Sequence, residues 1–184
     1  MVRRVGVSIG IPEPWGSELC GWRSRVGDPV ADSVPPHVTL LPPTDLDDAA
    51  MDEAEEHLSK VAAAHDPFEL HLRGTGTFRP VSDVVFVVVA RGISECEMLE
   101  RDVRSGVLDR TLRFPYHPHV TVAHDLPQEA LDAAYEGLAN FEAKFDVWGF
   151  TLFEHGRDGV WRPQRDFPFG GAIVGPLPPP GPAV

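Results

Sequence analysis

The tetrapeptide Pro-His-Val-Thr occurs twice in the chain, at residues 36–39 and 118–121, and this repeat narrows the range of possible folds. Each copy opens a short apolar stretch, which predicts two β-strands, over residues 37–41 and 119–123. Alternate residues of a strand point to the same face, so each histidine projects together with the threonine two positions later. If the two strands lie side by side, two imidazoles and two hydroxyls meet in one cleft.

Histidine and threonine in this arrangement are suited to chemistry at a phosphate group. The hydroxyls of Thr39 and Thr121 can donate hydrogen bonds to its non-bridging oxygens. A neutral imidazole takes a proton from an attacking hydroxyl or water, while a protonated one gives a proton to the leaving oxygen. Because the unperturbed pKa of histidine is about 6.5, His37 and His119 can fill both roles near neutral pH. A lone histidine on a strand is more often packed than catalytic, but the repeat of the whole tetrapeptide favours a catalytic pair.

Periodicity predicts strands and helices mixed along the whole chain. Beyond the two motif strands, we expect strands over residues 4–9, 68–72, 83–90, 145–153 and, after a hairpin turn, 160–167. Helical spacing predicts helices over residues 15–26, 46–64, 96–107 and 127–141. Pro42 and Pro43 should close the first motif strand, and residues 74–76 should form a turn or a bulge. Without a strict β-α-β alternation, this order favours an α+β fold with antiparallel pairing.

The overall composition is that of an ordinary folded protein with one domain. The chain has 184 residues, of which 42% are hydrophobic and 24% are charged. Its net charge of −12 argues against non-specific binding to nucleic acid, because phosphate backbones are held by an excess of Lys and Arg. A small anionic ligand is compatible with this charge, since one pocket can be locally basic. We expect a single bilobal domain over residues 1–174 and a mobile Pro-rich tail over residues 175–184.

The cysteines and the apolar runs bear on the cellular context. Cys20 and Cys96 lie far apart and outside any Cys-x-x-Cys pattern, which is typical of buried thiols in a reducing cytoplasm. No apolar segment of signal-peptide length follows the basic residues at the start of the chain. The longest apolar run, residues 84–90, is too short to span a bilayer. These features predict a cytoplasmic protein without a membrane segment, and we expect a monomer without a stable protein partner.

The paired His-x-Thr motifs resemble those of the 2H phosphoesterase superfamily. The resemblance is to the branch of bacterial 2′-5′ RNA ligases (LigT-like proteins) and cyclic phosphodiesterases, and it extends from the opening strand to about residue 169. It includes the segment Gly74-Thr75-Gly76-Thr77-Phe78-Arg79-Pro80 with the hydrophobic strand that follows. The resemblance implies a bilobal α+β fold, in which two antiparallel-sheet lobes with helices outside each contribute one motif to a central groove.

The same resemblance implies a reaction that needs neither a metal nor a cofactor. Relatives of this kind open 2′,3′-cyclic phosphates, or related cyclic phosphodiesters of nucleotides or RNA ends, to 2′-phosphates, and some have 2′-5′ RNA ligase activity. His37 and His119 correspond to the acid and the base, in either order, and Thr39 and Thr121 to the phosphate-holding hydroxyls. The implied partner is therefore a small nucleotide cyclic phosphate or an RNA terminus as substrate.

One departure from the family pattern concerns positive charge near the second motif. Many relatives carry an arginine shortly after it, where this chain has Val-Ala-His-Asp at residues 122–125. Arg79 and Arg113 are candidates to supply charge near the phosphate, although surface arginines are more commonly solvated. Phe78 and Tyr116 are candidates to stack on a nucleobase, against the alternative that they fill core space.

Two other functions are compatible with parts of the sequence. His117 and His119 have a spacing that can bind zinc, and His37, His124 and Asp125 could complete a metal-dependent hydrolase site. That alternative leaves the two threonines and the repeated tetrapeptide unexplained. The second alternative is a protein that binds a nucleotide or an RNA end without turnover, which has no need of two proton carriers. The remaining histidines are expected to be solvated: His57, His65, His71 and His155.

Overall fold

A computed structural model describes residues 1–170, and the tail expected over residues 175–184 lies outside this range. Within residues 1–170, eight strands form one antiparallel sheet. The strands are β1 (Val2–Gly10), β2 (His37–Asp47), β3 (Phe68–Thr77), β4 (Val84–Arg91), β5 (His119–His124), β6 (Glu142–Val147), β7 (Gly149–His155) and β8 (Trp161–Pro168). The helices are α1 (Trp15–Arg25), α2 (Asp48–Ala63), α3 (Ile93–Val103) and α4 (Gln128–Gly137), with a 3₁₀ turn at Gly106–Leu108. In this part of the chain, no helix is long and apolar enough to cross a bilayer.

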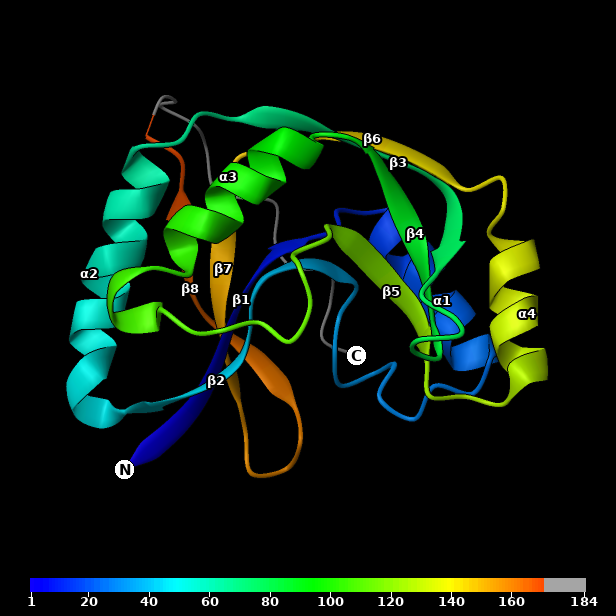
Figure 1. Ribbon diagram of the computed structural model, residues 1–184, viewed down its shortest axis with the longest axis horizontal. Coiled ribbons are helices and arrows are strands. Elements are labelled where there is room, and N and C mark those ends of the chain that lie inside the picture. The colour runs from blue at the N-terminus through cyan, green and yellow to red at the C-terminus, as the bar shows by residue number, and fades with distance from the viewer. Residues whose placement is uncertain (171–184) are drawn as a thin grey trace.

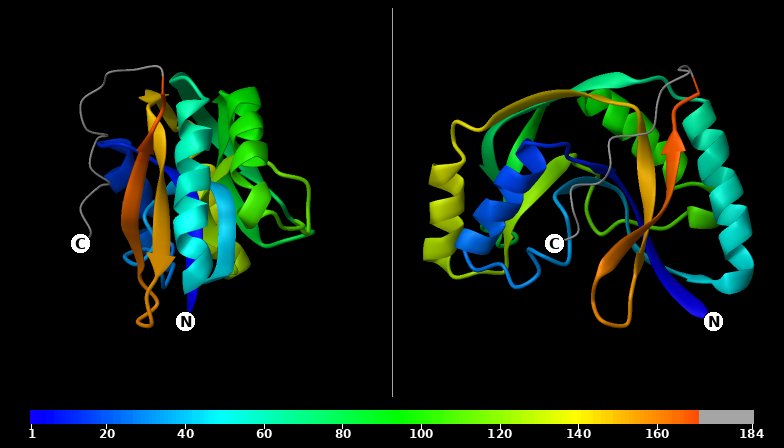
Figure 2. Two further views of the ribbon diagram at one scale, coloured as in Figure 1. Left: turned by 90° about the vertical axis from the view of Figure 1, so that its left-hand side faces the viewer. Right: turned by 180° about the vertical axis from the view of Figure 1, so that it is seen from behind.

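The sheet is divided into two lobes that meet where β2 lies beside β5 (Figure 1). One lobe contains β6, β3, β4 and β5 and packs against α1 and α4, and the other contains β2, β1, β7 and β8 and packs against α2 and α3. The chain crosses between them, because α1 follows β1 yet contacts β5, and α3 follows β4 yet contacts β2. Each lobe therefore carries two helices (Figure 2), and the expected bilobal α+β fold is confirmed.

Strand β2 continues through two prolines at which the sequence predicts its end. The register pairs Val5 with Thr44 and Val7 with Leu41, so Pro42 and Pro43 lie at an irregularity opposite Gly6. A proline cannot donate a hydrogen bond to a neighbouring strand, but it is tolerated at a bulge, where the ladder is already interrupted. The expected end at residue 41 was wrong for this reason.

The strand predicted over residues 145–153 is two strands that belong to different lobes. β6 pairs with β3, whereas β7 pairs with β1 near the other end of the sheet. The chain passes from one lobe to the other at Trp148, and both strands appear as one long arc when the molecule is viewed from behind (Figure 2). A periodicity of two marks extended backbone but carries no information about which neighbour it pairs with.

Two further boundaries differ from the sequence prediction. The helix predicted over residues 96–107 ends at Val103, shortly before Gly106, whose positive φ is incompatible with a continuing helix. Strand β3 runs on to Thr77, and its register with β4 shifts between Leu72 and Thr75. The Gly-Thr-Gly segment is therefore a bulge within a strand, which is one of the two predicted alternatives.

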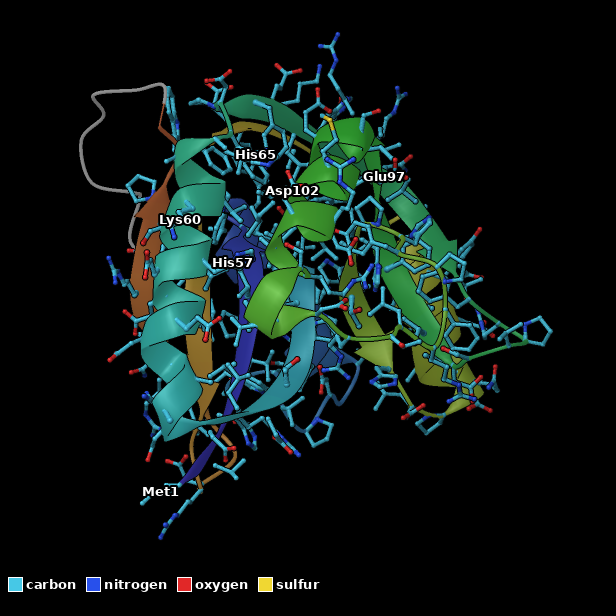
Figure 3. The ribbon with its side chains drawn as sticks, turned by 60° about the vertical axis from the view of Figure 1, so that its left-hand side comes forward. Met1, His57, Lys60, His65, Glu97 and Asp102 are labelled. Atoms are coloured by element: carbon cyan, nitrogen blue, oxygen red, sulfur yellow. The ribbon has the colours of Figure 1, made fainter. Side chains whose placement is uncertain are left out.

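His57 of α2 and His65, just after the end of α2, contact α3, although the sequence predicts that they are solvated (Figure 3). Nε2 of His57 lies 3.1 Å and 3.2 Å from the carbonyl oxygens of Asp102 and Val103, at the end of α3. Nε2 of His65 lies 2.9 Å from the carboxylate of Asp102. His71 similarly contacts Glu142 across the β3–β6 pair, at 2.8 Å. Because these partners are distant in sequence, the polar residues next to each histidine in the chain could not predict the contacts.

Replacing His57 with alanine should lower the free energy of unfolding by about 1–2 kcal/mol, because two carbonyls at the end of α3 lose their donor. Urea denaturation followed by circular dichroism measures this change. Lys60→Ala on the same helix is the matched control and should change stability by less than about 0.5 kcal/mol, since its pair with Glu56 is exposed. Equal stability of His57→Ala and the wild type would contradict the proposed contact.

Candidate active site

The two copies of the repeated motif meet at the junction of the lobes. Val38 of β2 pairs with Val120 of β5 in an antiparallel register. In such a register the residues flanking this pair oppose each other crosswise, so His37 lies across from Thr121 and Thr39 across from His119. Val38 and Val120 are fully buried at 0% exposure, whereas the four motif side chains on the opposite face are partly exposed.

Both imidazoles are oriented by the same local hydrogen bond. Nδ1 of His37 lies 2.7 Å from the carbonyl oxygen of Pro35, and Nδ1 of His119 lies 2.6 Å from that of His117. Because a carbonyl only accepts hydrogen bonds, this contact assigns the ring proton to Nδ1 and leaves the Nε2 lone pair available. The proline before each histidine keeps the preceding residue extended, which explains its presence in the motif.

A buried arginine positions the loop that precedes the first histidine. Arg23 of α1 is only 5% exposed and forms an ion pair with Asp28 at 2.8 Å. Its guanidinium also donates to the carbonyls of Val30 and Val34, just before Pro35. The helix of one lobe therefore holds the segment that places the His37 ring.

The environment of the two imidazoles favours their neutral forms. Burial lowers the pKa of His37, and the nearby charge of Arg23 lowers it further, against an opposing effect of the bond to Pro35. Burial also lowers the pKa of His119, with further lowering by His117 and His37 and an opposing effect of the backbone bond. Since a charge on His37 lowers the pKa of His119, protonation of one ring disfavours protonation of the other.

A large groove opens beside His119 and contains three of the four predicted substrate-binding residues. Its volume is about 650 Å³, and its walls come from the turn after β3 and from the segment before β5. Phe78, Arg113 and Tyr116 all line it. The hydroxyl of Tyr116 donates to the carbonyl oxygen of Thr39 at 2.9 Å, and burial raises the pKa of this hydroxyl. Tyr116 thus ties the groove wall to the motif strand.

Phe78 packs directly against the second motif histidine. Its ring centroid lies 5.1 Å from that of His119 in an edge-on arrangement, and 4.5 Å from that of Phe86. Phe86 in turn lies 5.2 Å from His119. The two phenylalanines therefore restrict the ring of His119, in addition to forming part of the groove wall.

The arginines near the site differ in the groups that their guanidinium contacts. The guanidinium of Arg79 contacts Asp132 at 2.8 Å and Gln128 at 3.1 Å, both on α4, and Arg79 does not line the groove. Arg113 lines the groove and is exposed. Arg110 also lines it, contacts the carbonyl of Pro43 at 2.6 Å, and has a buried Nε without a partner in residues 1–170. No periodicity or motif distinguishes Arg110 in the sequence.

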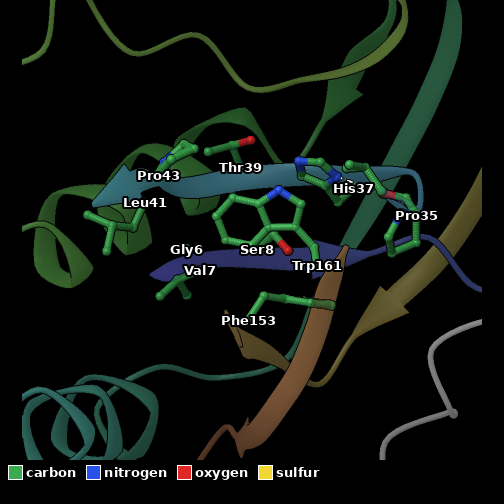
Figure 4. Close-up of a pocket in the computed structure, with 11 residues that line it drawn as sticks. Gly6, Val7, Ser8, Pro35, His37, Thr39, Leu41, Pro43, Phe153 and Trp161 are labelled. Carbon is green, nitrogen blue, oxygen red and sulfur yellow. Dashed lines mark hydrogen bonds between the residues drawn. The ribbon is translucent and has the colours of Figure 1, made fainter. Parts of the chain in front are cut away.

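A second, smaller pocket lies beside His37 (Figure 4). Its volume is about 170 Å³, and Thr39 belongs to both this pocket and the large groove. Ser8 of β1, which pairs with Thr39, lies on its floor, and Trp161 of β8 forms a wall. No local pattern in the sequence marks Ser8 or Trp161, because only the sheet order brings β1 and β8 to the motif strand.

The metal-binding alternative requires His124 and Asp125 to lie near the other histidines. His124 lies at the far end of β5, where its Nε2 is 3.2 Å from the carboxylate of Asp125 and both side chains are exposed. Throughout residues 1–170, no three or more His, Cys, Asp or Glu side chains are grouped so that they could hold a metal ion.

Comparison with known proteins identifies similar sequences. A family model described as the 2′-5′ RNA ligase superfamily matches residues 11–159. A Geobacillus protein named "putative phosphoesterase" is 30% identical over 140 residues, which cover 75% of this chain and 80% of that protein. An Oceanobacillus iheyensis protein with the same name is 30% identical over 128 residues, covering 70% and 71% of the two chains.

Solved structures show the same fold at lower sequence identity. E. coli LigT in complex with NADP⁺ superposes with a TM-score of 0.67 at 23% identity, covering 92% of this chain and 99% of LigT. The complex of LigT with 3′-AMP gives the same score at 21% identity and the same coverage. A Thermus thermophilus protein has a TM-score of 0.65 at 23% identity, covering 91% and 98% of the two chains. The expected LigT-like fold is therefore confirmed.

The two motif imidazoles should titrate below pH 6.5 and carry their neutral-state proton on Nδ1, because burial disfavours the charged form and Nδ1 donates to a carbonyl. Long-range ¹H–¹⁵N correlation spectra measure both properties, and His37→Ala and His119→Ala assign the signals. A ring that carries its proton on Nε2, or a pKa above 6.5, would contradict the described site.

Proposed function

Because the chain belongs to the 2′-5′ RNA ligase superfamily, we propose that it is a metal-independent phosphoesterase that opens 2′,3′-cyclic phosphates to 2′-phosphates. The observation that carries this proposal is the crosswise arrangement of two histidines and two threonines on one face of the β2–β5 pair. Both rings share one orienting bond and one available nitrogen, which are the properties that a proton-transferring pair requires.

In the proposed reaction, one imidazole removes a proton from water through its free Nε2. The water oxygen then forms a bond to phosphorus, and the bond from phosphorus to the 3′ oxygen breaks. The second imidazole, protonated, gives its proton to that oxygen. Thr39 and Thr121 donate hydrogen bonds to the non-bridging oxygens. The mutual effect of the two rings on their pKa values disfavours the state in which both are charged, so their protons are lost in separate steps and one charged and one neutral ring coexist between these steps, as this mechanism needs.

The substrate class that we propose is a nucleotide, or the end of an RNA chain, that carries the cyclic phosphate. The large groove is lined by Arg110 and Arg113 and by one carboxylate, Glu100, which pairs with Arg104. This locally basic lining on a chain of net charge −12 favours a local anionic ligand over a long nucleic acid. The complexes of E. coli LigT with nucleotides support this class. The same groups also serve 2′-5′ ligation, in which a 5′ hydroxyl replaces water.

Hydrolysis of 2′,3′-cyclic mononucleotides should continue in the presence of EDTA and should fall by about 10²- to 10⁴-fold in both His37→Ala and His119→Ala. The reason is that each variant removes one of the two proton carriers. The rate is measured from the release of the 2′-phosphate product, which is quantified by chromatography. Lys60→Ala, at an exposed position on α2, is the control for purification and folding and should retain full activity.

This experiment also separates the proposed reaction from its two alternatives. Activity that disappears with EDTA and returns with added zinc would indicate a metal-dependent hydrolase instead. Binding of cyclic nucleotides with no turnover under any condition would indicate a binding protein. Loss of activity in only one histidine variant would contradict a two-histidine mechanism.

The pH dependence of kcat/KM should be bell-shaped, with its maximum below pH 6.5. The base must be neutral, so the rate rises with pH through its pKa, and the acid must be protonated, so the rate falls with pH through its own. Both limbs are displaced to lower pH because burial lowers the pKa of His37 and of His119. Steady-state rates measured from pH 4 to 9 determine the profile, and a maximum at pH 7.5 or above would contradict the described environment.

A further inference from the structure

The surroundings of the two motifs are unequal, although the motifs themselves are identical. In the register of the sheet, Ser8 and Gly10 of β1 lie beside Thr39 and His37. The corresponding neighbours of the second motif, on β4, are Phe86 beside Thr121 and Val88 beside His119. Small residues thus flank the first motif, whereas large ones flank the second. The small pocket beside His37 occupies the space that larger β1 side chains would fill.

Gly6, the next residue of β1 on this face, provides room for the wall of that pocket. A Cβ atom at residue 6 would lie 3.3 Å from the six-membered ring of Trp161 and 3.3 Å from the carbonyl oxygen of Leu41. The absence of a side chain at residue 6 therefore allows the indole to lie close to the sheet, next to His37 and Thr39 (Figure 4).

The indole is held in this position by the strands that carry it. Trp161 pairs with His155 in the β7–β8 hairpin, and the two rings lie 4.9 Å apart. The backbone N–H of Trp161 also donates to the carbonyl oxygen of Ser33, in the loop before the first motif. A ring restrained in this way loses little conformational freedom when a ligand packs against it.

The chemistry of the pocket favours a flat, uncharged group. Its lining includes the aromatic side chains of Trp161 and Phe153 and the apolar side chains of Val34 and Pro35. None of the residues that line it is an Asp, Glu, Lys or Arg, and burial lowers the pKa of His37, which favours the uncharged ring. The volume of about 170 Å³ is below that of sites for whole drug-sized ligands, so it accommodates one ring system.

We infer that this pocket binds the nucleobase of the substrate and that Trp161 is the surface on which the base stacks. The inference deepens the proposed function and rests on it, because it assumes that a nucleotide phosphate lies between the two motifs. A base in the pocket places the sugar next to Thr39 and His37, while any continuing nucleotide chain occupies the large groove with Arg110 and Arg113.

The test compares a substrate that has a base with one that lacks it. For adenosine 2′,3′-cyclic phosphate, Trp161→Ala should raise KM by about 5- to 150-fold, the range expected for loss of one base stack. For methyl riboside 2′,3′-cyclic phosphate, in which a methoxy group replaces the base, KM should change by less than about 2-fold. Trp161→Phe keeps an aromatic surface and should recover most of the affinity. Met98→Ala, at an exposed position on α3, is the control.

A binding measurement keeps this inference independent of turnover. In a His119→Ala background, calorimetric titration with adenosine 2′,3′-cyclic phosphate should show weaker binding when Trp161 is also alanine. If the wild type turns over neither substrate but this difference in binding persists, the proposed reaction is wrong and the base pocket stands. If Trp161→Ala affects both substrates equally, or leaves nucleotide binding unchanged, or if the nucleotide does not bind at all, the base pocket is wrong.

Discussion

The pairing of Val38 with Val120 is the contact on which the candidate site depends. It joins the two lobes, and it sets the register that places each histidine across from the threonine of the other motif. Because side chains alternate along a strand, a slip of one residue would turn one whole motif toward the core. The complete burial of both valines opposes such a slip, since it would expose apolar side chains and bury imidazoles. The hydrophobic face of the junction thus fixes the geometry of its polar face.

The path of the chain strengthens this junction. Helices α1 and α3 each pack on the lobe opposite to the strand that precedes them, and the step from β6 to β7 at Trp148 crosses between the lobes once more. Arg23 shows the consequence for the site, because a residue of α1 holds the loop that leads into His37. Neither lobe is a continuous segment, so the two motifs come together only when most of the chain has folded.

The sequence was informative where function depends on local pattern and uninformative where it depends on a distant partner. Residues 36–39 and 118–121 predict the paired motif strands and the face on which their side chains lie, since both follow from a period of two. Trp161 and Arg110 reach the site only through the sheet order and an irregular loop, which no local pattern encodes. Arg79 is the opposite case. It follows the groove residue Phe78 in the sequence, but its guanidinium pairs with Asp132 on α4.

The duplicated motif leaves the two histidines chemically alike, so any division of labour between them must come from their neighbours. His119 packs against Phe78, Phe86 and His117, which restrict its ring, and it borders the large groove. His37 instead borders the small pocket and lies near the charge of Arg23. If the base lies in the small pocket, as we propose, the sugar lies beside His37, and the side of His119 is left to the group that attacks phosphorus in line. Small residues on β1 and large ones on β4 therefore give two identical motifs different surroundings, so that the two sides of the site are not equivalent.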